Sequence, residues 1–94
     1  MEQLHAIVHG RVQGVNFRYY TLQEARKRGL VGWVRNRPDL TVEVRAEGPR
    51  DQLEQFLAFL HRGSPSANVT RVQAEWLPAS GTFTTFEIRY GSSD

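Results

Sequence analysis

The segment from residue 30 to residue 47 reads LVGWVRNRPDLTVEVRAE and decides the fold class of this 94-residue chain. In its second half Val42, Val44 and Ala46 fall on one face, and charged residues fall on the other. This alternation is typical of an antiparallel strand with one buried face and one wet face. Because residues 37–40 have the composition of a turn, the segment predicts a hairpin of two strands.

A helix is predicted on each side of this hairpin. Residues 16–28 show a weak helical stripe, with Asn16 as the N-cap and Gly29 as the stop. Residues 49–62 show a stronger one, with Pro49 at the first helical position and apolar residues spaced i, i+3, i+4 and i+7. The hairpin therefore lies between two amphipathic helices.

Further strands are expected over residues 4–9, 69–76 and 84–90, followed by a frayed polar tail at 91–94. The order matches an α+β, ferredoxin-like βαββαβ sandwich: an antiparallel sheet of four to five strands with two helices on one face. Right-handed crossovers place the third strand between the first and second, and the fourth beyond the first. The length predicts a single domain, residues 1–94.

The composition limits the possible partners and locations. The formal net charge of +2 is too small to indicate a nucleic acid or an anionic membrane as a partner. The absence of Cys excludes disulfides, thiolate nucleophiles and thiolate metal sites. No signal-peptide pattern or membrane-length apolar run is present. We expect a cytoplasmic monomer.

Residues 10–18 read GRVQGVNFR and join the end of a strand to the start of a helix. The first amides of a helix lack internal partners, and two glycines allow the loop amides to converge on an anion. Arg18, in the first helical turn, could bind two phosphate oxygens. From these features alone, a second interpretation stays open, in which the glycines only shape a turn and Arg18 is solvated.

The motifs of this chain resemble those of the acylphosphatase family. Residues 10–18 match the family signature G-x-V-Q-G-V-x-F-R at every fixed position, and residues 32–36 (Gly-Trp-Val-Arg-Asn) are similar to its second signature. The similarity extends over essentially the whole chain. It implies the ferredoxin-like fold and the hydrolysis of small acyl phosphates such as acetyl phosphate, carbamoyl phosphate and 1,3-bisphosphoglycerate, with no metal or organic cofactor.

The resemblance also implies the roles of individual residues. Arg18 would bind the substrate phosphate and Asn36 would orient the attacking water, and inorganic phosphate or sulfate would compete for the site. Loop amides would complete the phosphate cradle, those of Val12, Gln13, Gly14, Val15, Asn16 and Phe17. Leu40 stands where the family has Gly, so the hairpin turn is expected to differ locally. The signature covers the phosphate end of a substrate and does not identify the acyl group.

The implied chemistry is consistent with the residues present. The leaving carboxylate has a pKa near ~4, so it departs at neutral pH without a general acid. An RNA-binding module of the same topology is disfavoured, because the strand at residues 41–47 has no aromatic residue and two acids on its wet face. The second alternative is a non-catalytic phosphate or carbamoyl-phosphate sensor. The presence of both Arg18 and Asn36 favours the enzyme.

Other polar residues fit no site. His5 and His9 share a strand face but lie about 13 Å apart, too far to bind one metal ion. Ser64 and Ser66 fall in a turn that lacks the sequence context of a nucleophile elbow.

Overall fold

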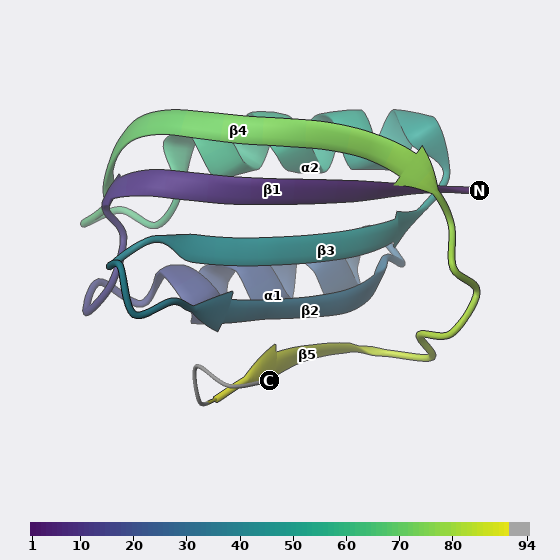
Figure 1. The fold of residues 1–94 in the computed structure, drawn as a ribbon, viewed down its shortest axis with the longest axis horizontal. Coiled ribbons are helices and arrows are strands. Elements are labelled where there is room, and N and C mark those ends of the chain that lie inside the picture. The colour runs from purple at the N-terminus through teal and green to yellow at the C-terminus, as the bar shows by residue number, and fades with distance from the viewer. Residues whose placement is uncertain (91–94) are drawn as a thin grey trace.

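A sheet with both helices packed on one face forms the molecule, as Figure 1 shows for the computed structural model. The structure describes residues 1–90, so the tail predicted at 91–94 lies outside the described residues. The elements are, in chain order, β1 (Glu2–Arg11), α1 (Phe17–Lys27), β2 (Val31–Asn36), β3 (Val42–Gly48), α2 (Arg50–Arg62), β4 (Asn68–Pro78) and β5 (Phe86–Arg89). The ferredoxin-like fold class is confirmed.

The strand order is β4-β1-β3-β2-β5, so the predicted positions of the third and fourth strands are confirmed. The pairs β1–β3, β1–β4 and β2–β3 are antiparallel, but β5 pairs with β2 in parallel. The sheet is therefore mixed, whereas an antiparallel sheet was expected. The cause is the long connection after β4, which crosses to the far edge of the sheet and returns β5 in the direction of β2 (Figure 1).

The core lies between the sheet and the helices. Alternate positions of β1, β2 and β3 point into it and are fully buried: Leu4, Ala6, Val8, Val34, Val42, Val44 and Ala46. From α2, Phe56 meets Phe86 of β5 edge to face, with ring centroids 6.0 Å apart. Each fully buried Leu or Phe side chain contributes about 1.5–3 kcal/mol, so the apolar alternation of the strands accounts for the position of the helices.

The opposite face of β3 is less exposed than predicted. Glu43 is 8% exposed, where a wet face was expected. His5 Nε2 donates to Glu43 Oε2 at 2.6 Å, and Arg35 lies 2.8 Å from Glu43 Oε1. Burial alone would raise the pKa of Glu43, but the hydrogen bonds and charges of His5 and Arg35 outweigh it and lower that pKa. A histidine and an arginine on adjacent strands thus cover a carboxylate that the pattern placed in solvent.

Glu47 of β3 is only 3% exposed and anchors the connection between β4 and β5. Its Oε2 accepts hydrogen bonds from Gln3 Nε2 at 2.5 Å and from the Ser80 amide and hydroxyl at 2.8 Å each. Its Oε1 accepts from the Gly81 amide at 3.1 Å. Burial would raise the pKa of Glu47, but these donors reverse the shift and lower the pKa. The carboxylate therefore fixes the loop that delivers β5 to the sheet edge.

Two boundary residues differ from their expected roles. Pro49 is the N-cap of α2 in an extended conformation, and the helix begins one residue later than predicted. Leu40, in the β2–β3 turn, has φ +73°, a left-handed conformation that costs a non-glycine residue about 1–2 kcal/mol. The turn keeps the backbone that glycine favours although leucine occupies it.

Candidate active site

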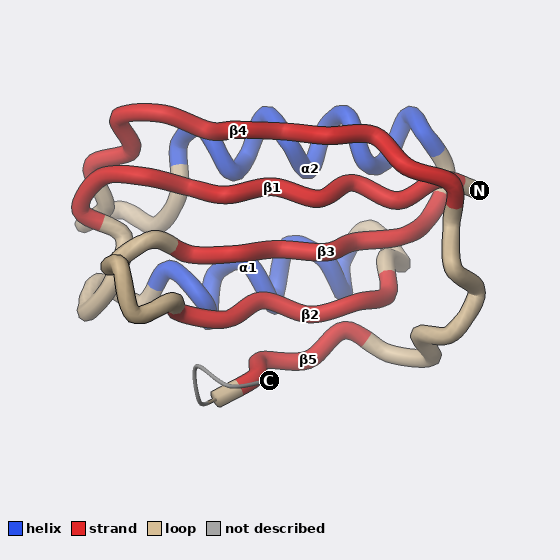
Figure 2. The backbone as a smooth tube through the Cα atoms, in the orientation of Figure 1, coloured by secondary structure: helices blue, strands red, loops and turns tan. Residues whose placement is uncertain are grey.

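A pocket of about 340 Å³ lies at the start of α1, where the β1–α1 loop faces the end of β5. Figure 2 shows that the β1–α1 loop, the β2–β3 turn and the α2–β4 loop all lie at this end of the sheet. The pocket is lined by loop and helix residues on one side and by the end of the chain's last strand on the other: Val12, Gly14, Asn16, Phe17, Arg18, Tyr19, Ile88 and Tyr90.

The backbone of this loop is shaped to present amides. Gly14 and Asn16 both have left-handed φ angles, +73° and +61°. The first hydrogen bond at this end of the helix runs from Tyr20 N to Asn16 O at 3.1 Å, and the amides of residues 14–19 donate to no acceptor within residues 1–90. Asn16 is the N-cap residue, as predicted, but its side chain makes no capping bond. The site therefore holds a run of free backbone donors at the positive end of a helix dipole.

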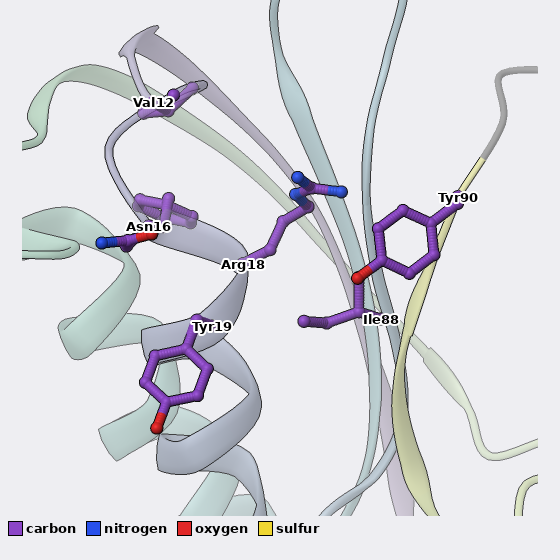
Figure 3. Close-up of a pocket in the computed structure, with 8 residues that line it drawn as sticks. Val12, Asn16, Arg18, Tyr19, Ile88 and Tyr90 are labelled. Atoms are coloured by element: carbon purple, nitrogen blue, oxygen red, sulfur yellow. The ribbon is translucent and has the colours of Figure 1, made fainter.

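Arg18 extends from the first turn of α1 into the pocket (Figure 3). Its guanidinium lies 5.2 Å from the ring centroid of Tyr90, on the opposite wall. Among residues 1–90, no carboxylate forms an ion pair with Arg18. Aromatic contact orients a guanidinium without neutralising it. The arginine fork is thus held in place with its charge available to an anion.

Gln13 joins the loop to the hairpin that carries Asn36. Its side-chain Nε2 donates to the carbonyl oxygens of Arg37 and Thr41, both at 2.9 Å. Gln13 is not among the residues that line the pocket. Gln13, which was predicted to belong to the phosphate cradle, therefore also connects the β1–α1 loop to the β2–β3 turn.

Asn36, the last residue of β2, lies at the same end of the sheet but outside the pocket lining. It pairs with Val42 and alternates with buried Val34, which places it on the helix-covered face. The parallel pairing of Arg35 with Arg89 brings Asn36 beside the position of Tyr90, a wall of the pocket. Its Oδ1 atom is shielded from solvent and accepts no hydrogen bond from residues 1–90.

The pocket thus unites Arg18 with four of the six predicted loop residues: Val12, Gly14, Asn16 and Phe17. Val15 and Gln13 are not among the lining residues, and Val15 is buried in the core. The prediction missed Tyr19, Ile88 and Tyr90 as lining residues. The alignment of Ile88 and Tyr90 with Phe86 was visible in the sequence, but their contribution depends on the parallel pairing of β5 with β2.

Within residues 1–90, no three His, Asp or Glu side chains are grouped so that they could hold a metal ion. None of the helices in that part of the chain is long and apolar enough to cross a membrane.

Comparison with known proteins connects this site to one family. The acylphosphatase family model matches residues 4–88. The chain is 51% identical over 90 residues to an acylphosphatase of Bacillus licheniformis, covering 96% of this chain and 100% of the relative. The crystal structure of acylphosphatase from Bacillus subtilis superposes with a TM-score of 0.93 at 44% identity, covering 96% of this chain and 100% of that one.

A more distant structure, an acylphosphatase from Coxiella burnetii, superposes with a TM-score of 0.88 at 35% identity, covering 94% of this chain and 93% of that one. The similarity thus spans both the sheet and the loop that forms the pocket. The chain belongs to the acylphosphatase family, hydrolases whose known activity is the cleavage of acyl phosphates.

Proposed function

We propose that Arg18 and the backbone amides of residues 12–17 hold the phosphoryl group of the acyl phosphate, and that Asn36 orients the attacking water. The observation that carries this proposal is the pocket at the start of α1. It combines an arginine that pairs with no carboxylate of residues 1–90 and a run of amides with no acceptor among them. A dianion satisfies both groups at once.

The hydrolysis of an acyl phosphate requires few other groups from the protein. Phosphoryl transfer spreads charge over three equatorial oxygens, and preorganised donors stabilise that charge as it develops. The planar fork of Arg18 can contact two of these oxygens while the loop amides contact the others. The carboxylate leaving group has a pKa near ~4 and departs without protonation. Positioning and charge stabilisation are therefore the main contributions of the site.

The amide of Asn36 suits a water because it carries both donor and acceptor atoms. Its Oδ1 accepts no hydrogen bond from residues 1–90, so it retains the capacity to accept a hydrogen bond from the nucleophilic water. A neutral amide is too weak a base to remove that proton. In our proposal the water proton passes to a phosphoryl oxygen as the oxygen–phosphorus bond forms and the bond to the carboxylate breaks.

The test is hydrolysis of benzoyl phosphate by the purified chain and by Arg18→Gln. We expect the substitution to lower kcat/KM by about 10³-fold and to weaken competitive inhibition by inorganic phosphate, by analogy with other arginines on transferring phosphoryl groups. Arg18→Lys should recover little, because lysine lacks the bidentate fork. Arg62→Gln, an exposed arginine at the end of α2, is the matched control and should behave as the wild type.

Near-normal turnover by Arg18→Gln would remove the guanidinium from the mechanism. Phosphate binding without turnover by the wild type would instead favour a non-catalytic sensor.

Monomeric state, cytoplasmic location and the absence of a nucleic-acid partner stay predictions. The sequence of β3, VEVRAEG, offers no aromatic side chain on which a base could stack, and this supports the last of these predictions. Light scattering and a gel shift at low salt test the first and the third.

A further inference from the structure

Ser64, set aside above as a nucleophile, makes a buried contact with the phosphate loop. It lies in the α2–β4 loop and is only 3% exposed. Its hydroxyl donates to the carbonyl oxygen of Val15 at 2.6 Å, across 49 positions of sequence. Because Val15 is itself buried, this is a short hydrogen bond shielded from water, and it joins two loops that are distant in the chain.

The contact fixes the direction of a backbone amide. In a trans peptide the carbonyl oxygen and the next N–H point to opposite sides of the C–N bond. Residues 1–90 contain no cis peptide bond, so a Val15 carbonyl directed at Ser64 sends the Asn16 N–H away from Ser64. Asn16 lines the pocket, and its amide donates to no acceptor within residues 1–90. The hydrogen bond at the back of this peptide thus leaves its free N–H on the other side.

The residues around Ser64 in the α2–β4 loop are tightly packed. Gly63 has φ +71°, and a Cβ there would lie 2.6 Å from the Phe17 ring, so the α2–β4 loop approaches the start of α1 as closely as a backbone allows. The Ala67 amide donates to the Ser64 carbonyl at 3.0 Å and closes the turn. These contacts hold the Ser64 hydroxyl in place relative to the phosphate loop.

We propose that Ser64 is a positioning residue for phosphate: it orients the Val15–Asn16 peptide so that the Asn16 amide donates to the bound phosphoryl group. The inference rests on the phosphate site proposed above and adds a residue to it from outside the loop. Ser64 acts through the backbone and does not touch the substrate.

The experiment is a titration with inorganic phosphate, followed by the amide NMR signals of the full chain. In the wild type, the Asn16 amide signal should shift on phosphate binding. In Ser64→Ala, we expect the phosphate Kd and the KM for benzoyl phosphate to rise about tenfold, the effect of one weakened hydrogen bond to a charged group. The phosphate-induced shift of Asn16 should shrink. Ser66→Ala, an exposed serine of the same turn, should match the wild type.

Ser64→Cys replaces the hydroxyl with a slightly larger and weaker donor, and should fall between the wild type and Ser64→Ala. It also provides the test if the alanine variant does not fold. A purely structural role would lower the melting temperature and leave phosphate affinity unchanged, and that result overturns the proposal. Arg18→Gln distinguishes a failure of the phosphate site from a failure of the Ser64 role. If Arg18→Gln binds phosphate as tightly as the wild type, the proposed phosphate site is wrong. If Arg18→Gln binds phosphate weakly but the Ser64 variants bind it normally, only the proposed role of Ser64 is wrong.

Discussion

The pocket and the sheet face that carries no helix (the open face) are both rich in polar groups, but these groups differ in whether they have hydrogen-bond partners. On the open face, Glu43 and Glu47 are enclosed by donors from neighbouring strands and loops. At the pocket, Arg18 has no carboxylate partner among the described residues, Asn36 Oδ1 accepts nothing from them, and the loop amides have no acceptor among them. Satisfied polar groups stabilise a fold, whereas polar groups without partners mark where a ligand is expected.

This contrast predicts that changes at the pocket alter turnover and that changes on the open face alter stability. Asn36, at the end of β2, is the sharpest case. Its shielded Oδ1 makes no hydrogen bond with residues 1–90, so removing it should not lower the free energy of unfolding.

After Arg18→Gln, Asn36→Ala is expected to give the largest effect. Loss of the group that aligns the water should lower kcat by about 10²-fold or more, because misplacement of a reacting group costs that much. The inhibition constant for inorganic phosphate and the urea midpoint should stay near their wild-type values. Steady-state kinetics with benzoyl phosphate measure kcat and the inhibition constant, and urea unfolding measures the midpoint. Asn68→Ala, at an exposed position, is the control. An alanine variant with normal kcat would contradict the water-orienting role.

Glu47→Gln should show the reverse pattern. The amide nitrogen that replaces one carboxylate oxygen would face donors from Gln3, Ser80 or Gly81. We expect a loss of about 2 kcal/mol in the free energy of unfolding, as for a broken buried bond to a charged group, with kcat nearly unchanged. The exposed carboxylate of Glu87 on β5 provides a control, Glu87→Gln. A normal urea midpoint for Glu47→Gln would show that the loop does not depend on this carboxylate.

Acid should lower the stability that Glu43 and Glu47 contribute, by less than Glu47→Gln does. Glu43 and Glu47 have pKa values lowered below 4.5 in the folded chain. Their contribution is therefore complete above the unfolded pKa and is lost as the pH falls through the lowered folded values. Urea midpoints between about pH 7 and pH 3 should decline below about pH 4.5, and a Glu43→Gln/Glu47→Gln variant should decline less. An equal decline in both proteins would assign the acid sensitivity to other groups.

Leu40→Gly should have the smallest effect, and it raises stability. Leu40 is 69% exposed at φ +73°, so glycine relieves strain without opening a cavity. After the entropy that glycine adds to the unfolded chain, we expect a gain of about 0.5–1 kcal/mol. Leu40→Ala keeps the Cβ and should leave the urea midpoint nearly unchanged. Equal midpoints for the glycine and alanine variants would show that the turn carries no backbone strain.

Local features of the chain were determined by the sequence alone. Period-2 alternation predicted β3, and the spacing of apolar residues predicted α2, because each pattern needs only one buried face. Residues 10–18 predicted a strand-to-helix loop with an arginine in the first helical turn, since glycines, helix-end amides and an arginine are all local properties.

The tertiary structure decided what depends on distant partners. The connection that crosses the sheet made β5 parallel to β2 and brought Tyr90 to face Arg18. Donors on other elements enclosed Glu43 and Glu47, and a hydroxyl from the α2–β4 loop reached the Val15 carbonyl. Alternation assigns a residue to a face of the sheet, but what covers that face depends on which strands and loops pack beside it. For the same reason the motifs of the sequence indicated Arg18 and Asn36 as candidates but not the residues that surround and support them.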